Sequence, residues 1–231
     1  MSKVPSDIEI AQAAKIPMIT PSSTNEKITK VGDYIFRACF IDNFQGEAMA
    51  RFALETLKIK RVAILTDFNS DYSKGLSDTF GTTFNHLGGK VVSQKTYFQG
   101  DEDYSQQLKA IKGANPDAIY ISGYYNSVGI IAKQAREMGI KSIFLGGDGW
   151  DAPDLWDLAG NSLNNAYITN HFTITSPDEK AKIFTANYKK LFGLDADAFE
   201  NGSSVDDSRV KADDISSSSD CEMTKLIGPT T

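Results

Sequence analysis

Short apolar segments alternate with amphipathic segments along the chain from Arg61 onward. The apolar segments are mostly continuous, which is typical of strands covered by helices on both faces of a parallel sheet. Their starts lie roughly 23 to 30 residues apart, which is close to the length of one strand-and-helix unit. The pattern therefore predicts strands over residues 61–65, 91–97, 118–121, 143–145 and 166–169.

Between these strands, apolar residues recur every three or four positions, the spacing of one helix face. Gly88 and Gly139 end two of these stretches, as glycine often does after the last turn of a helix. The run Ser-Pro-Asp-Glu at residues 176–179 is a strong helix start. We predict helices over residues 45–57, 76–87, 104–111 and 128–138, and a last helix from Pro177 to about Phe192.

The first 41 residues follow another pattern, with the end of a helix at 10–15 and two strands at 16–20 and 34–40. A hydroxyl-rich loop, residues 21–25, joins these strands. Two strands do not make a stable sheet by themselves. We therefore expect an α/β protein, with a Rossmann-like parallel sheet flanked by helices and an incomplete second lobe. The apolar residues between Ile16 and Phe40 should be partly exposed.

Composition changes this picture mainly at the C-terminal end. The chain has 231 residues and a net charge of −6, so nothing suggests nucleic acid or anionic lipid as a partner. Residues 201–231 contain no aromatic side chain and are rich in Ser and Asp. A segment of this kind buries too little apolar surface to fold alone. We expect residues 200–231 to be a disordered tail.

Cysteine and histidine are scarce, with two of each in the chain. Neither a disulfide framework nor a zinc site is expected, because zinc needs about four clustered N or S ligands. The first ten residues lack the apolar core of a signal peptide, and no apolar run approaches a membrane span. The sequence as given would thus predict a cytosolic protein, although an exported protein whose signal is missing would show the same pattern.

Polar and aromatic residues follow three of the predicted strands. Parallel strands present their carboxyl ends at one edge, where ligands of open α/β sheets bind. Tyr72, Tyr124 and Asp148 should meet at this edge and would suit a small ligand with a cationic group. Each also has a structural interpretation: Asp148, between glycines, can form a turn, and the tyrosines can be packing residues.

Evidence for catalysis is weak. The sequence has no dinucleotide, phosphate-binding, nucleophile-elbow or zinc-protease motif. Asp67 and Asp148, both at strand ends, could form the acid pair of a hydrolase, but nothing fixes their separation. His171 follows the last predicted strand and is interpreted as a residue at the edge of the domain. We expect no enzyme activity, cofactor or metal.

Several segments resemble one family in the same order along the chain. They are IPMITPSSTN (16–25), YIFRACFIDNFQGEAMARFA (34–53), RVAILTDFNSDYSKGL (61–76), GDEDYSQQLKAIKGANPDAIYISGYY (100–125) and AREMGIKSIFLGGDGWDAPDL (135–155). Together they are similar to the leucine/isoleucine/valine-type substrate-binding proteins of ABC transporters. The resemblance extends over about residues 10–199.

The resemblance implies two Rossmann-like lobes that clamp an amino acid between them. Residues 1–41 would be a remnant of the first lobe, 42–171 the nearly complete second lobe, and 172–199 a helix returning to the first. Ser22, Ser23 and Thr24 match the loop that binds the ligand carboxylate. Tyr72 and Tyr124 match tyrosines around the ligand, and Asp148 matches the acid that pairs with its ammonium group. The partner would be a membrane permease, and the location periplasmic or extracellular.

The chain also departs from the family pattern. Roughly the first third of the family sequence, with the export signal and one ligand-binding loop, has no counterpart before Met1. After Phe199 the aromatic-free tail stands where the family has an apolar helix. We therefore expect weak or absent ligand binding by this chain alone. The alternative is a degenerate single lobe that folds but has no role in transport.

Overall fold

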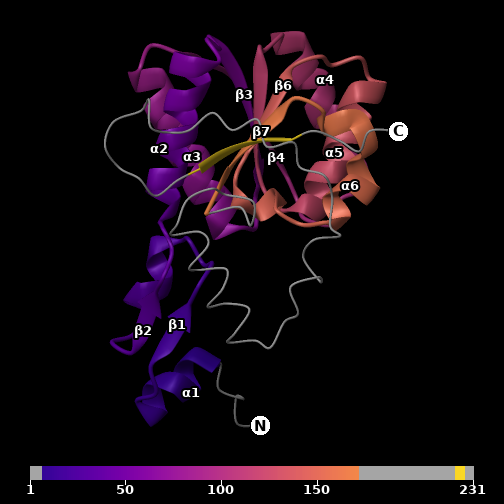
Figure 1. The fold of residues 1–231 in the computed structure, drawn as a ribbon. Coiled ribbons are helices and arrows are strands. Elements are labelled where there is room, and N and C mark those ends of the chain that lie inside the picture. The colour runs from indigo at the N-terminus through magenta and orange to yellow at the C-terminus, as the bar shows by residue number, and fades with distance from the viewer. Residues whose placement is uncertain (1–6, 172–221, 227–231) are drawn as a thin grey trace.

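The computed structural model describes residues 7–171 and 222–226. Its centre is a six-stranded sheet with the order β4-β3-β5-β6-β7-β8 (Figure 1). The first five of these strands are parallel, and β8 pairs antiparallel with β7. The strands are β3 (Arg61–Asp67), β4 (Lys90–Tyr97), β5 (Ala118–Ser122), β6 (Ile143–Gly146), β7 (Ala166–Asn170) and β8 (Glu222–Leu226). Five of the six were predicted, and the predicted parallel sheet is confirmed.

Helices cover both faces of the sheet (Figure 1). On one face lie α2 (Asp42–Arg51), the π-helical turn η2 (Phe52–Thr56) and α3 (Asp71–His86). On the other lie α4 (Ser105–Ala114), α5 (Tyr125–Glu137) and the short α6 (Asp154–Ala159). Two short 3-10 turns, η3 (Asp148–Trp150) and η4 (Gly160–Leu163), complete the connections.

The core has two layers because successive residues of β3 point to opposite sides. Val62 and Ile64 pack with the apolar side chains of α2 and α3. Ala63 and Leu65 pack with those of α4, α5 and α6. All four of these residues are buried, which explains the continuous apolar pattern of the strand. Because both faces of the sheet are buried, a ligand can reach only the residues at the ends of the strands.

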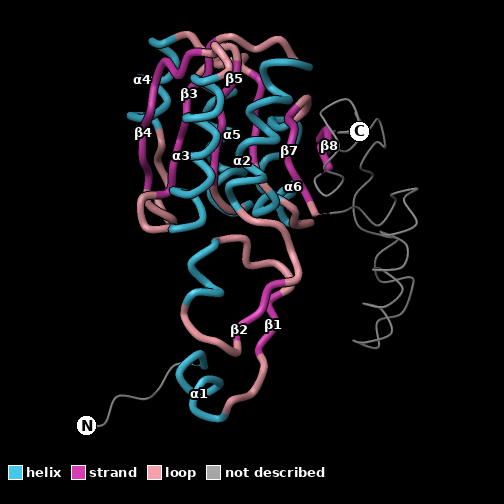
Figure 2. Tube along the Cα trace, turned by 90° about the vertical axis from the view of Figure 1, so that its left-hand side faces the viewer, coloured by secondary structure: helices cyan, strands magenta, loops and turns pink. Residues whose placement is uncertain are grey.

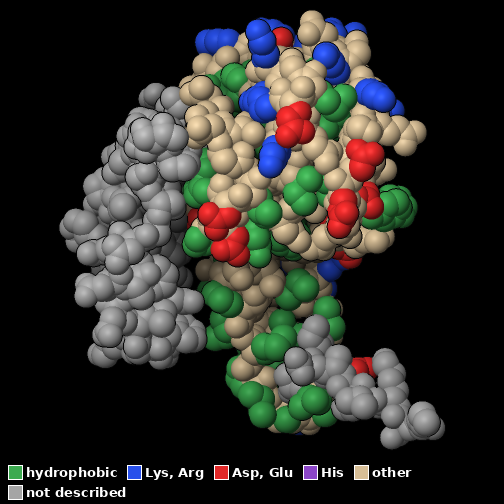
Figure 3. Space-filling view, turned by 90° about the vertical axis from the view of Figure 1, so that its right-hand side faces the viewer, with side chains coloured by type: hydrophobic (Ala, Val, Ile, Leu, Met, Phe, Trp, Pro, Cys, Tyr) green, Lys and Arg blue, Asp and Glu red, His purple; other side chains and the backbone are tan. Residues whose placement is uncertain are grey.

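Residues 7–41 form a small extension of this body (Figure 2). It contains α1 (Asp7–Ala14), β1 (Met18–Thr20), the 3-10 helix η1 (Glu26–Lys30) and β2 (Ile35–Arg37). The strands β1 and β2 form a parallel two-stranded sheet. Apolar side chains gather on the surface of the extension (Figure 3). The predicted exposure is confirmed for Ile16, Ile19, Val31 and Phe36, which are about half exposed or more.

Some predicted elements differ in the structure or lie outside it, and the helix predicted for residues 76–87 begins five residues earlier, at Asp71. The helix predicted for residues 45–57 begins three residues earlier, at Asp42, and ends in the π-helical turn. Residues 222–226, placed in the disordered tail, form β8 at the edge of the sheet. Without β8, β7 would be the last strand of the sheet, and its unpaired backbone groups can bind a nearby segment. This pairing depends on the folded structure, so the composition of residues 222–226 does not predict it. The helix from Pro177 and the rest of the tail lie outside the described residues.

Candidate ligand-binding site

The structure brings together three of the predicted site residues at the carboxyl ends of β3, β5 and β6. Tyr72 lies in the first turn of α3, Tyr124 directly precedes α5, and Asp148 begins η3. The Tyr72 hydroxyl donates to Oδ1 of Asp148 over 2.7 Å. The rings of Tyr72 and Tyr124 stack with centroids 5.2 Å apart. The end of the sheet thus combines an acid with two aromatic walls.

Asp148 accepts hydrogen bonds from three different elements. Besides Tyr72, Gln45 Nε2 of α2 donates to Oδ1 over 2.7 Å, and His171 Nε2 lies 3.0 Å from Oδ2. Burial alone would raise the pKa of this carboxyl, but the hydrogen bonds from His171, Gln45 and Tyr72 outweigh it and lower the pKa. Asp148 is therefore ionised at neutral pH.

Two of these partners, Gln45 and His171, were missed by the sequence analysis. Gln45 is 103 residues away from Asp148 along the chain, and no local motif links the two. His171 was interpreted as an edge residue, yet its side chain is only 18% exposed and reaches Asp148. Its position directly after the last parallel strand was the available signal, because such positions converge on one edge of the sheet.

The two tyrosines keep their protons. Burial, together with the charge of Asp148, raises the pKa of Tyr72 well above its usual value. The Tyr72 hydroxyl also accepts from the backbone N–H of Gly149 over 2.9 Å. Burial likewise raises the pKa of Tyr124, although 39% of this residue is exposed. Tyr72 is therefore held in place by the loop, whereas Tyr124 forms a more accessible wall.

The glycines around Asp148 allow close packing. A Cβ atom at Gly147 would lie 2.8 Å from the Tyr72 hydroxyl oxygen and would also collide with the Gln45 amide. One at Gly149 would lie 2.7 Å from the Gly123 carbonyl oxygen. Trp150 is 1% exposed and belongs to the core. The glycine-rich loop therefore lets α2 and α3 approach Asp148.

The loop of residues 21–25 is held through its backbone. Nη1 of Arg37 donates to the carbonyl oxygens of Ser23, Thr24 and Asn25, over 3.2, 2.8 and 2.8 Å. Ser22 is exposed and Ser23 is partly buried, whereas Thr24 is only 2% exposed. Among the described residues no hydrogen bond or ion pair joins these three to the other predicted site residues. Their role in binding a carboxylate remains a prediction.

Asp42, the first residue of α2, contacts this loop. It is 2% exposed, and its backbone N–H donates to the Thr24 carbonyl over 3.0 Å. Burial raises the pKa of the Asp42 carboxyl to about 6, an effect that the nearby Thr24 hydroxyl opposes and the charge of Asp148 reinforces. Asp42 therefore changes charge close to neutral pH. It directly follows residues 38–41, which join the extension to the larger body.

Other chemistry is not supported by the described part of the chain. No group of three His, Cys, Asp or Glu side chains there could hold a metal ion. Asp67 is buried, and its Oδ1 accepts from the backbone N–H of Asn69 over 3.0 Å. No contact between Asp67 and Asp148 is found among these residues, so the geometry adds nothing to the hypothesis of an acid pair.

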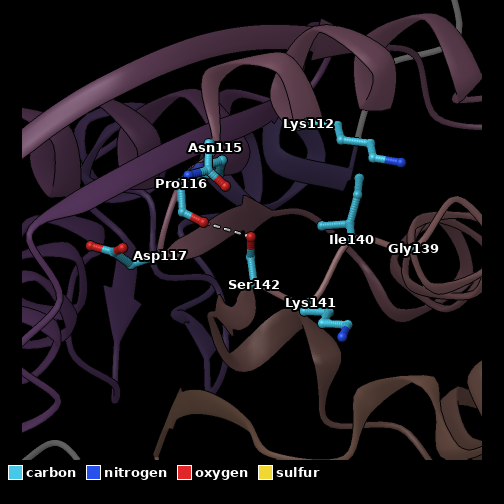
Figure 4. Close-up of a pocket in the computed structure, with 8 residues that line it drawn as sticks. All are labelled: Lys112, Asn115, Pro116, Asp117, Gly139, Ile140, Lys141 and Ser142. Atoms are coloured by element: carbon cyan, nitrogen blue, oxygen red, sulfur yellow. Dashed lines mark hydrogen bonds between the residues drawn. The ribbon is translucent and has the colours of Figure 1, made fainter.

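A hollow of about 430 Å³ lies at the opposite end of the sheet (Figure 4). It is formed where the chain enters β5 and β6. Two of its polar side chains donate hydrogen bonds to backbone carbonyl groups. Ser142 Oγ donates to the Pro116 carbonyl over 2.7 Å, and Lys112 Nζ donates to the Met138 carbonyl over 2.6 Å. We assign no ligand to this hollow, since the acid and the aromatic walls lie at the other edge.

Comparison with known proteins decides the family. A family model described as periplasmic binding protein matches residues 8–203. The chain belongs to this family. Members are binding proteins rather than enzymes, which excludes the hydrolase hypothesis. The family comparison also supports the interpretation of the sheet and its helices as one lobe of such a protein.

Individual relatives agree with this assignment. The Leu/Ile/Val-binding protein BraC3 of Rhizobium johnstonii is 34% identical over 166 residues, 71% of this chain and 45% of BraC3. The crystal structure of the leucine-binding protein LivK of Thermotoga maritima is 43% identical, with a TM-score of 0.73, covering 80% of this chain and 53% of LivK. LivJ of Streptococcus pneumoniae, solved with isoleucine, is 36% identical, with a TM-score of 0.70, covering 79% of this chain and 52% of LivJ.

The chain spans about half the length of the relatives it matches. None of the helices in the described residues combines the length and the apolar character needed to cross a membrane.

Proposed function

We propose that this chain provides the second-lobe half of an amino-acid receptor that serves an ABC transporter. Asp148 would bind the ammonium group of the ligand, with Tyr72 and Tyr124 beside its carbon atoms. The observation that carries this proposal is the ionised, largely buried carboxylate of Asp148 beside two stacked tyrosines. An ammonium ion can replace a hydrogen-bond donor there and pair with the charge.

A branched aliphatic amino acid is the proposed substrate. Support comes from the similarity to LivK, a leucine-binding protein, and to LivJ, which was solved with isoleucine. In this proposal the bound, closed form is recognised by a membrane permease, and the protein works in the periplasm or outside the cell. Ser22, Ser23 and Thr24 would contact the ligand carboxylate from the other side of the cleft.

The affinity of this chain alone should be low. Asp148 already accepts hydrogen bonds from Gln45, Tyr72 and His171, so an ammonium group must displace at least one of them. Each hydrogen bond to a charged group contributes about 1.5–3 kcal/mol. We expect dissociation constants for L-leucine roughly in the high micromolar to millimolar range.

The test is an NMR titration of the 231-residue chain with L-leucine, L-isoleucine and L-valine. Asp148→Asn should weaken L-leucine binding by about tenfold or more, because it removes the charge that pairs with the ammonium group. Asp154→Asn, an exposed aspartate of α6, is the matched control and should bind like the unsubstituted chain. Binding of L-leucine that survives Asp148→Ala overturns this site.

A second candidate is a lobe that folds without binding an amino acid. The observation in its favour is that Asp148 already has three partners in the structure, from Gln45, Tyr72 and His171. Thermal unfolding separates the two candidates, because a ligand that binds the native state raises its stability. A cooperative transition that none of the amino acids shifts, even at tens of millimolar, favours the non-binding lobe.

A further inference from the structure

His171 lies between two parts of the candidate site. Its ring stacks on Phe40, with centroids 4.0 Å apart and planes 26° apart. Its Nε2 atom lies 3.0 Å from Oδ2 of Asp148, and both side chains are largely buried, with 18% and 12% exposed. Phe40 belongs to the connection that enters α2, and His171 directly follows β7. The ring therefore touches the connection from the extension and the acid of the site at once.

Neighbouring residues hold this ring in position. The backbone N–H of His171 donates to Asn170 Oδ1 over 2.8 Å. The Asn170 side chain in turn donates from Nδ2 to Asp151 Oδ2, also over 2.8 Å. With the Phe40 stack, these contacts direct Nε2 toward Asp148. The contact with Asp148 is thus part of an ordered network.

The protonation state of His171 decides what Asp148 can accept. A neutral imidazole with hydrogen on Nε2 donates to Oδ2 and leaves the negative charge of Asp148 in place. An imidazolium at the same distance neutralises that charge and repels a second cation nearby. Histidine in an ordinary environment makes this change between about pH 5 and 8.

We propose that His171 is a specificity-determining residue of the ammonium subsite, admitting a cationic ligand group at Asp148 only while its imidazole is neutral. The proposal rests on the proposed function, since it requires an ammonium ligand at Asp148. Amino-acid binding should then weaken as the pH falls and His171 takes up a proton. The same imidazolium would replace the ligand as a partner for the buried carboxylate.

Other charged and titratable groups face the same acid, and one of them needs a control. Asp42 changes charge near pH 6 and also favours a cation when ionised, so it would act in the same direction. Burial raises the pKa values of Tyr72, Tyr124 and Cys39, so these groups stay neutral in this range.

Two further charged groups lie nearby. Arg37 is directed at the carbonyl oxygens of the loop around Thr24. The Asp151 carboxylate accepts from Asn170, and the backbone N–H of Asp151 donates to the Asp148 carbonyl oxygen over 3.0 Å. Asp42 is therefore the group that must be separated from His171 by substitution.

The experiment measures L-leucine affinity by NMR between pH 5 and 8 for the full chain, His171→Gln and Asp42→Asn. The glutamine amide can donate to Asp148 as Nε2 does, but it carries no charge at any pH. We expect affinity to fall by about tenfold from pH 7.5 to pH 5 in the full chain, and by somewhat less in Asp42→Asn, which lacks the contribution of Asp42. In His171→Gln it should change by less than about threefold.

A second measurement needs no substitution. The chain has two histidines, and His86 lies at the last residue of α3, the helix whose first turn holds Tyr72. Because linkage is reciprocal, saturating L-leucine should move the titration curve of the His171 ring to lower pH, by about one pH unit for each tenfold change in affinity. The curve of His86 should stay where it is.

The results separate this role from the proposed function. L-leucine binding whose pH dependence is as large in His171→Gln as in the full chain, or a His171 curve that bound L-leucine leaves unmoved, overturns the role of His171 alone. If no amino acid binds at any pH, the proposed function fails and this role fails with it. If His171→Gln does not fold, the titration of the unsubstituted chain decides.

Discussion

Asp42 is the residue at which a single charge has the clearest consequence for stability. Its carboxyl is buried at the first residue of α2, and neither oxygen makes a hydrogen bond of good geometry among the described residues. Burial raises its pKa from 3.8 to about 6, an effect that Thr24 opposes and Asp148 reinforces. The folded chain therefore holds this proton more tightly than the unfolded chain does.

This raised pKa predicts how stability changes with pH. The contribution of Asp42 is fully present below about pH 4 and is lost as the pH rises through 6. Asp42→Asn, which is neutral throughout, should raise the free energy of unfolding at pH 8 by about 3 kcal/mol and change it little below about pH 4. Urea unfolding at several pH values measures this difference. Asp78→Asn, an exposed aspartate of α3, should show no such dependence, and equal curves for both variants would contradict the prediction.

The loop after β6 shows how an element brings distant residues together. The small glycines beside Asp148 let Gln45 of α2 and Tyr72 of α3 reach the same carboxylate. A Cβ atom at Gly147 would collide with both of them. The local geometry of the site is therefore a property of the loop as much as of the three side chains.

Gly147→Ala tests this role of the loop. The added methyl group would collide with Gln45 and the Tyr72 hydroxyl, and we expect a loss of about 1–3 kcal/mol in the free energy of unfolding. A methyl group added at Gly113 in α4 would have no atom within 4 Å, so Gly113→Ala should instead stabilise the chain by about 0.5–1 kcal/mol. Urea unfolding of both variants gives the comparison. A loss at Gly113 as large as that at Gly147 would show that the crowding at Gly147 is not the cause.

The parallel strands were predictable because burial on both faces makes each of them a continuous apolar run, as Val62 to Leu65 illustrate. Tyr72, Tyr124 and Asp148 were predictable because parallel strands end at one edge. Gln45 and His171 were not, since their contacts with Asp148 depend on how separate elements pack. β8 was missed because its sequence has no strand pattern of its own, and the strand forms by pairing with the backbone of β7.

The whole molecule combines a well-packed body with a small, apolar extension. Ile19 of β1 and Phe36 of β2 are cross-strand neighbours and are 63% and 50% exposed. Monomeric proteins rarely leave such adjacent apolar side chains uncovered. A further contact that covered the extension would therefore bury exposed apolar surface and stabilise the chain.

We expect the isolated chain to self-associate through this extension. Ile19→Lys combined with Phe36→Lys should shift the chain toward the monomer, because two charges would then face each other across any shared apolar surface. Sedimentation velocity over a range of concentrations measures the shift. Phe68→Lys with Phe98→Lys, an exposed aromatic pair at the sheet edge, is the control. A chain that is already monomeric at high concentration contradicts the prediction.

The buried position of Trp150 has a consequence for spectroscopy. This indole lies two residues after Asp148, is 1% exposed and donates from Nε1 to the Ile121 carbonyl over 3.1 Å. The other tryptophan of the chain, Trp156, packs only partly buried against the same core. Fluorescence from the deeper ring should therefore be shifted to short wavelength and resist aqueous quenchers. The molecule carries its own optical reporter close to the acid proposed to receive the ligand.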